Sequence, residues 1–193
     1  MIANQIPNYI SPAEYLTLEE DSLIKHEYID GEIYAMAGAS DADVTIAGNL
    51  FAMLRNHLRG SGCRVYMSDM KAFVEAADAF YYPDVMVACD ARDKNIANHK
   101  KYPCLIVEFL SGTTEAFDRG EKFASYQKMQ NLQEYILISQ KRQRLDCFRR
   151  NREGLWVLQS YSAGSEITIE SVNFKTSIDS LYEDVDFANN QGQ

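Results

Sequence analysis

The sequence has few cysteines, and it lacks any hydrophobic run long enough to cross a membrane. Its four cysteines are scattered among 193 residues without a CxxC pair: Cys63, Cys89, Cys104 and Cys147. This spacing argues against a structural zinc site, and we expect four buried or half-buried free thiols in a reducing cytoplasm. No apolar run approaches the roughly 18 residues of a membrane span, so we expect a soluble protein without a membrane partner. Residues 1–9 also lack the basic start and apolar core of a secretory signal.

Positive charge is also scarce. The chain has 19 Lys and Arg against 28 Asp and Glu, a net charge of −9. Nucleic-acid binding over a broad basic surface is therefore excluded, because such affinity comes mainly from neutralising phosphates. Two local basic runs remain: Lys94, Lys100 and Lys101, and then Lys141, Arg142, Arg144, Arg149, Arg150 and Arg152. We interpret both as solvated surface, with a local nucleic-acid-binding face as the alternative.

The remaining composition is that of a folded protein. Hydrophobic residues make up 46% of the chain and aromatic residues 11%, which excludes a disordered chain. At 193 residues the chain suits one domain, and no linker or repeat divides it. We therefore predict a single domain over residues 1–193, with a frayed polar tail at 189–193.

The first third of the chain carries clear helix and turn signals. Ser11 followed by Pro12 and Glu14 predicts a helix that ends near residue 19. Asp30-Gly31 predicts a hairpin over residues 26–36, which places Glu27 on its first strand. A longer helix is predicted from Ser40 or Asp41, because apolar residues then recur at helical spacing until Gly60.

The rest of the chain is rich in strand-like runs. Strands are predicted at residues 63–68, 70–76, 80–89, 102–110 and 134–139, a helix at 118–129, an antiparallel meander at 142–149, 155–162 and 165–170, and a short helix closing at Leu181. This order favours an α/β (α+β) unit with a central mixed sheet.

Two of these strand runs each carry one acid. Pro83 directly precedes Asp84, which we expect at the start of a strand, and alternation places Glu108 on one face with Ile106 and Leu110. An isolated carboxylate in an apolar run is costly, and two brought together would repel each other. A divalent metal with oxygen ligands relieves both effects. The alternatives are a strand-end acid paired with an arginine for Asp84 and a buried ion pair for Glu108.

A cation follows on the next predicted helix. Asp118 and Lys122 are spaced to lie on one side of it. Alone, they are an ordinary surface pair worth ~0.3 kcal/mol. The joint pattern is more informative, because Asp84 is followed 24 positions later by Glu108 and 14 positions further by Lys122.

Together these motifs resemble a known family. The matching segments are Glu27-Tyr28-Ile29-Asp30-Gly31-Glu32-Ile33, Tyr82-Pro83-Asp84-Val85-Met86-Val87, Leu105-Ile106-Val107-Glu108-Phe109-Leu110-Ser111 and Asp118-Arg119-Gly120-Glu121-Lys122-Phe123-Ala124-Ser125-Tyr126. In order and spacing they are similar to the Uma-type restriction endonucleases, a branch of the PD-(D/E)XK nuclease superfamily. The resemblance covers about residues 10–183 and implies a restriction endonuclease-like core, a central mixed sheet flanked by helices.

The resemblance also implies a site and a reaction. Asp84 and Glu108 would hold Mg²⁺, or Mn²⁺ in its place, with Glu27 as an additional acid, for hydrolysis of DNA phosphodiesters. The superfamily's usual lysine position is Leu110 here, so the lysine would come from the helix as Lys122. The family's loop often has a histidine after the serine, whereas Ser40 is followed here by Asp41-Ala42-Asp43.

Three functions are compatible with these residues. The first is a metal-dependent DNA endonuclease, for which we expect a cytoplasmic homodimer, since two-fold assembly suits cleavage of two strands. The second is a nonenzymatic DNA-binding or assembly module on a nuclease fold. The third is a carboxylate-metal phosphoesterase that acts on RNA or nucleotides.

Overall fold

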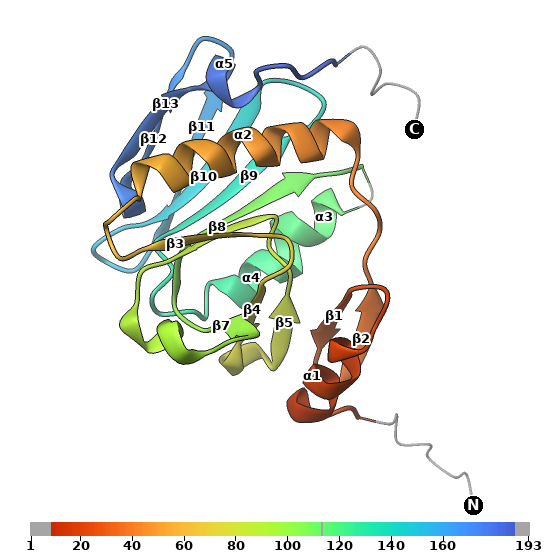
Figure 1. The fold of residues 1–193 in the computed structure, drawn as a ribbon. Coiled ribbons are helices and arrows are strands. Elements are labelled where there is room, and N and C mark those ends of the chain that lie inside the picture. The colour runs from red at the N-terminus through yellow and green to blue at the C-terminus, as the bar shows by residue number, and fades with distance from the viewer. Residues whose placement is uncertain (1–8, 113, 188–193) are drawn as a thin grey trace, which may run out of the picture.

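The computed structural model describes residues 9–112 and 114–187, and it is built from strands that divide into separate sheets (Figure 1). The helices are α1 (Pro12–Glu20), α2 (Asp41–His57), α3 (Glu115–Phe117), α4 (Phe123–Tyr126) and α5 (Ile178–Leu181), with 3-10 turns η1 (Glu75–Ala77), η2 (Ala91–Asn95) and η4 (Glu170–Val172) and the π-helical turn η3 (Asp118–Lys122). The predicted frayed tail, 189–193, and residues 1–8 of the amino terminus lie outside the described residues.

The strands form two larger sheets and a ribbon. They are β1 (His26–Ile29), β2 (Glu32–Ala35), β3 (Arg64–Met67), β4 (Lys71–Val74), β5 (Ala79–Tyr81), β6 (Val85–Ala88), β7 (His99–Lys100), β8 (Pro103–Leu110), β9 (Glu134–Ser139), β10 (Arg144–Arg150), β11 (Trp156–Ser162), β12 (Glu166–Ile169) and β13 (Phe174–Ser177). The six-stranded sheet has the order β11-β10-β9-β8-β6-β3, the five-stranded sheet β2-β1-β5-β4-β7, and β12 pairs with β13.

The six-stranded sheet is mixed, because β8 and β9 run parallel while its other pairs are antiparallel. Helix α2 lies across one face of this sheet, and α3 and α4 lie on the other side of β8 (Figure 1). Leu105, Val107 and Phe109 of β8 pack in the same core as α2, whereas Ile106 and Leu110 pack in the core of α4. The alternation predicted for β8 is thus confirmed, as is the mixed α/β class.

The early elements follow their sequence signals. Ser11 caps α1 and Ser40 caps α2, each in a capping box with the acid three residues later. Asp30 and Gly31 have φ of 48° and 88° in the turn between β1 and β2, a conformation that favours glycine. The predicted hairpin and both helices are therefore confirmed.

The strand predicted over residues 80–89 is wrong as a single element. The chain leaves the five-stranded sheet after β5 and enters the six-stranded sheet at β6, with Tyr82, Pro83 and Asp84 between them. Pro83 has no N–H to donate to a ladder, which explains the break at this point. The break carries the chain from one sheet to the other directly before Asp84.

Two further expectations need correction. The helix predicted over 118–129 instead begins at Glu115, passes through η3 and ends at Tyr126. The predicted meander holds for β10 and β11, but β12 leaves that sheet and pairs with β13, which the sequence analysis did not find. Ile167, Ile169 and Phe174 of this ribbon pack into the core beside α2, and this burial favours the ribbon over extension of the sheet.

The expectation of four free thiols is wrong, because Cys63 and Cys89 form a disulfide, while Cys104 and Cys147 are free. The interpretation of the basic runs as solvated surface is wrong for Lys100, which is 3% exposed. Its buried ammonium donates hydrogen bonds to the carbonyl groups of Asp93 and Ile96. Across residues 9–112 and 114–187, no helix combines the length and apolar character that crossing a bilayer requires.

Candidate active site

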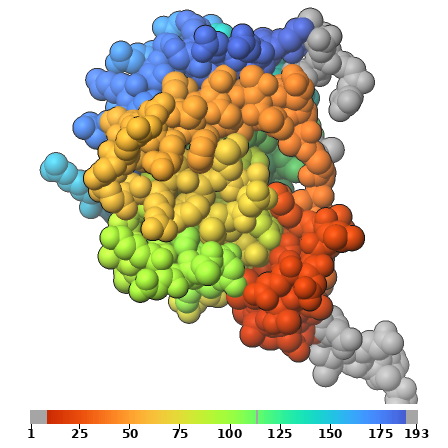
Figure 2. Space-filling model, in the orientation of Figure 1, coloured from red at the N-terminus to blue at the C-terminus, as the bar shows by residue number. Residues whose placement is uncertain are grey.

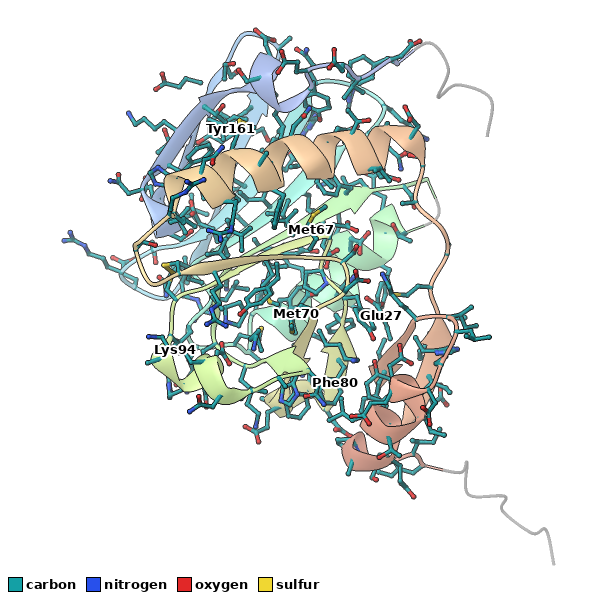
Figure 3. All side chains as sticks on the ribbon, in the orientation of Figure 1. Glu27, Met67, Met70, Phe80, Lys94 and Tyr161 are labelled. Atoms are coloured by element: carbon teal, nitrogen blue, oxygen red, sulfur yellow. A yellow bond between two sulfur atoms is a disulfide. The ribbon has the colours of Figure 1, made fainter. Side chains whose placement is uncertain are left out.

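Acids from both larger sheets converge near one helical turn. Glu27 lies on β1, at the side of the hairpin that faces the body of the molecule (Figure 3). Asp84 directly precedes β6, Glu108 lies on β8, and Lys122 ends η3. Figure 2 shows a recess between the orange atoms of α2 and the red atoms of the amino-terminal lobe, with green atoms of the segment after β8 at its bottom.

The strand register brings Asp84 opposite Glu108. Val85 pairs with Val107 in the antiparallel ladder of β6 and β8, so the next pair outward is Asp84 with Glu108. The Asp84 carboxylate is fixed by the Phe109 N–H, which donates to Oδ2 at 2.7 Å. The two carboxylates therefore lie side by side at the edge where β6 begins.

Lys122 is buried among carboxylates. Its side chain is 7% exposed, and its Nζ lies 2.9 Å from Glu27 Oε1, 3.0 Å from Glu108 Oε1 and 3.7 Å from Asp118 Oδ1. The Tyr81 ring centroid lies 5.4 Å from the same ammonium. The ammonium tip thus faces the acids and not bulk solvent, and the structure brings Glu27, Glu108 and Lys122 into direct contact.

Tyrosines enclose this ion network. Tyr126 donates to Glu108 Oε1 at 3.0 Å, the Tyr82 N–H donates to Glu27 Oε1 at 3.3 Å, and Tyr135 donates to the Asp118 carbonyl at 3.0 Å. Tyr81 and Tyr82 are 1% and 4% exposed, so both pack in the protein interior. The rings keep water from most of the network and strengthen the interactions among its charges.

Burial and neighbouring charge set the electrostatics of the site. Burial raises the pKa of Asp84 to about 6 and raises the pKa of Glu108 well above its usual value, against the opposing effect of Lys122. Burial likewise raises the pKa of Asp118. For Lys122, burial opposes the charged form, but Glu108, Glu27 and Asp118 outweigh it and raise the pKa. Lys122 is therefore charged at neutral pH, while the acids outnumber it.

The donor set suits a hard divalent cation. In the part of the chain that the structure describes, no three His, Cys, Asp or Glu side chains are spaced to hold a metal ion. Mg²⁺, however, commonly takes only one or two protein carboxylates, with water and substrate phosphate as its other ligands. Asp84 and Glu108 fit this requirement: both are oxygen donors, they are adjacent in register, and burial penalises the charge that a cation would balance.

Three residues of this site escaped the sequence analysis as functional candidates. Asp118 is 4% exposed, so its pair with Lys122 is not the surface pair that spacing alone suggests. Tyr126 is 18 positions from Glu108 in the sequence, so its hydrogen bond to that carboxylate depends on the tertiary fold. Asp43 contributes to the raised pKa of Asp84, after burial, and its buried Oδ1 accepts no hydrogen bond within the described residues. Its place two residues after the family's histidine position was the available signal.

The fold defines the class of protein. A solved structure described as a "putative nuclease belonging to DUF820", from Anabaena variabilis ATCC 29413, superimposes with a TM-score of 0.74. The match covers 90% of this chain and 97% of that one at 18% sequence identity. The protein thus has the mixed α/β fold of restriction endonuclease-like nucleases.

The sequence comparisons identify the family. The Uma2 family, described as "Putative restriction endonuclease", matches residues 12–179, and the chain belongs to this family. Two similar proteins come from Synechocystis sp. (strain ATCC 27184 / PCC 6803 / Kazusa). "Uncharacterized protein slr1290" is 39% identical over 178 residues, covering 92% of this chain and 94% of that protein. "Uncharacterized protein sll1609" is 33% identical over 153 residues, covering 77% and 85%. Family and fold together point to a nuclease.

Proposed function

We propose that the protein is an endonuclease that uses Mg²⁺, or Mn²⁺ in its place, to hydrolyse phosphodiester bonds of DNA. The observation that carries this proposal is the burial of the Lys122 ammonium against Glu27 and Glu108, beside the register pair of Glu108 and Asp84. Two adjacent carboxylates can hold a divalent cation, and an ammonium beside them can stabilise the charge that develops in phosphodiester hydrolysis.

Each group has a role that its surroundings favour. Asp84 and Glu108 hold the cation, with Glu27 as a third acid within reach of the same pocket. The cation, when bound, lowers the pKa of a water molecule and polarises the scissile phosphate. Lys122 orients the attacking water or balances the charge that develops on the phosphate, and no covalent enzyme intermediate is required. Asp118 and Glu27 keep the ammonium charged and in place.

The neighbouring groups restrain these side chains. The Phe109 N–H fixes one oxygen of Asp84, and the Tyr126 hydroxyl fixes one oxygen of Glu108. Both bonds hold the carboxylates before substrate arrives, so less ordering is needed on binding. The net charge of −9 repels DNA, and a cation held by Asp84 and Glu108 would offset this repulsion where the phosphate must approach.

Plasmid cleavage tests the proposal directly. Supercoiled DNA is incubated with the full chain in Mg²⁺, in Mn²⁺ or in EDTA, and nicked and linear products are quantified. We expect cleavage only with a divalent cation. Asp84→Ala and Lys122→Ala should each lower the rate by about 10²-fold or more, because the first removes a proposed ligand of the cation and the second removes the ammonium proposed to act on the attacking water or the phosphate.

Matched controls separate chemistry from folding. Asp179→Ala and Lys175→Ala remove an exposed acid and an exposed lysine and should leave cleavage unchanged. In case Lys122→Ala does not fold, Lys122→Gln, which retains hydrogen-bond donors, is tested beside it. Circular dichroism checks that each variant is folded. DNA binding without cleavage would favour the assembly module. Hydrolysis of RNA or nucleotides with intact duplex DNA would favour the phosphoesterase.

A further inference from the structure

Three of the four cysteines lie together, away from the acids. Cys63 directly precedes β3, Cys89 directly follows β6, and Cys104 lies near the start of β8. Asp84 precedes β6, so the cysteines occupy the opposite end of that strand. The strand order β8-β6-β3 makes the three strands immediate neighbours. The cluster therefore lies at one end of three neighbouring strands of the six-stranded sheet.

The register explains how the sulfurs meet. Arg64 pairs with Ala88, so the next pair outward in this antiparallel ladder is Cys63 with Cys89. Between β6 and β8 the register shifts at Val87 and Ala88, which pair with Leu105 and Pro103 and leave Cys104 out of the ladder. Such a bulge redirects a side chain. The Cys104 Sγ lies 3.7 Å from the Cys89 Sγ, which is sulfur contact distance.

The cluster is accessible from solvent. Cys89 is exposed, and Cys63 and Cys104 are half-buried. The remaining cysteine, Cys147, is 0% exposed and lies near the buried Glu134 carboxylate, with its Sγ 3.7 Å from Oε1. Cys147 therefore serves as a buried thiol against which the reactivity of the three clustered cysteines can be compared.

We propose that Cys63, Cys89 and Cys104 form a thiol–disulfide exchange site. The Cys104 thiolate attacks the Cys89 Sγ, the bond between Cys63 and Cys89 breaks, and the bond between Cys89 and Cys104 forms. Cys63 leaves as a thiolate and takes up the proton that Cys104 released, so no oxidant or reductant is consumed. One thiol is free in either pairing, and its reaction partners are small or protein disulfides. Its thiolate attacks one sulfur of such a disulfide and forms a mixed disulfide, and the other sulfur of the partner leaves as a thiolate that takes up a proton.

The surroundings of Cys104 set the rate. Burial raises the pKa of its thiol to about 11, and the charge of Glu134 at the start of β9 acts in the same direction. The attacking thiolate is then a minor species at neutral pH, and its population rises about tenfold for each pH unit. Exchange is accordingly slow at pH 7 and faster at pH 9. The site acts independently of the acids around Lys122, so nuclease assays do not bear on it.

Alkylation under native conditions tests the proposal. The oxidised full chain is incubated with N-ethylmaleimide at pH 7, 8 and 9, then digested with trypsin without reduction and analysed by mass spectrometry. Trypsin places the three cysteines in different peptides, because Arg64, Lys71, Arg92 and Lys101 lie between them. We expect peptides linked through Cys63 and Cys89 and through Cys89 and Cys104, and Cys63 alkylation that rises about tenfold per pH unit. Cys147 should stay unmodified.

Two variants make the outcome decisive. Cys63→Ser, oxidised with a small disulfide, should form the bond between Cys89 and Cys104, and Cys104→Ser should protect Cys63 from alkylation completely. Cys147→Ser is the matched control and should behave like the unaltered chain. The proposal is overturned if Cys63 stays unmodified at pH 9 in the unaltered chain, or if Cys63→Ser retains two free thiols at Cys89 and Cys104.

Discussion

Lys122 is the residue on which the charge balance of the site depends. Three carboxylates lie within 3.7 Å of its ammonium, from β1, β8 and the beginning of its own helical turn. A buried carboxylate without a partner is costly, so removal of this ammonium leaves several acids that must take up protons. Under the proposed function, the same excess of acid over base would favour a divalent cation here.

The raised pKa of Asp84 predicts that this residue lowers the stability of the metal-free protein by an amount that depends on pH. Between pH 4 and 6 the folded state keeps a proton that the unfolded chain has lost, so stability falls as pH rises through this window. Asp84→Asn should therefore raise the free energy of unfolding by roughly 3 kcal/mol at pH 8 and leave it nearly unchanged at pH 4. Urea denaturation in EDTA measures this.

Asp179→Asn, at an exposed position, is the control for Asp84→Asn and should change stability little at either pH. A loss of stability at pH 8 in Asp84→Asn would show that its carboxylate charge stabilises the metal-free fold.

Asp118 is predicted to position Lys122 without touching substrate. Asp118→Asn removes one of the three charges that keep the ammonium protonated and in place. If the nuclease proposal holds, kcat should fall about tenfold while KM stays nearly constant, because the group affects the transition state more than binding. Steady-state cleavage of a short duplex measures both constants, and partial rescue in Asp118→Glu supports positioning. An equal rise in KM would contradict this role.

At the scale of elements, η3 and the amino terminus of α2 decide the shape of the site. The π-helical turn carries both Asp118 and Lys122, and π-helical turns occur frequently at functional sites. Ser40, the N-cap of α2, also donates to Gln140 Oε1 at 2.7 Å. The Gln140 amide in turn donates to the Leu110 carbonyl at 3.1 Å. Through these bonds the start of α2 is tied to the ends of β8 and β9.

Two matched caps test how much this tie contributes. Ser11 and Ser40 are both half-buried and both form capping boxes, but of the two only Ser40 is also hydrogen-bonded to a side chain of a distant segment, that of Gln140. Ser11→Ala should cost about 1 kcal/mol, whereas Ser40→Ala should cost about 2 kcal/mol, because Gln140 also loses its partner. Thermal or urea denaturation of both variants measures the difference, and equal losses would show that the Gln140 bond adds nothing.

At the scale of the whole molecule, the site depends on both larger sheets. The chain passes from the five-stranded sheet to the six-stranded sheet at Pro83. Glu27 belongs to the five-stranded sheet, whereas Glu108 belongs to the six-stranded sheet. Lys122 bridges both through its ion pairs. Binding of a cation to the folded state alone should therefore stabilise the entire protein.

Metal binding is predicted to raise the melting temperature. At a Mg²⁺ concentration 100 times its dissociation constant, the gain is about 2.7 kcal/mol, or several degrees for a chain of this size. Differential scanning calorimetry with Mg²⁺, and with Ca²⁺ as a noncatalytic ion, measures the shift. Asp84→Asn should lose most of it. A shift of the same size in this variant would place the cation elsewhere.

The homodimer stays a prediction from symmetry, since two-fold pairing of active sites suits cleavage of both DNA strands. Sedimentation velocity should give a mass near twice the 22.0 kDa of one chain. A single species at the monomer mass over the micromolar range would contradict it.

By itself, the sequence determined the local elements and the candidate residues. Capping residues, the Asp30-Gly31 turn and hydrophobic periodicity depend on near neighbours, so α1, the first hairpin and α2 were predictable from local chemistry. The order of Asp84, Glu108 and Lys122 identified the family before any distance was known.

Only the tertiary structure decided how these residues meet. The split of one predicted strand into β5 and β6 and the pairing of Cys63 with Cys89 depend on strand register between distant segments, and the burial of Asp118 depends on how η3 packs against the sheets. Spacing along the chain carries no information on register across it, because partners are selected by packing of the whole core. The charge network around Lys122 is therefore a property of the folded molecule.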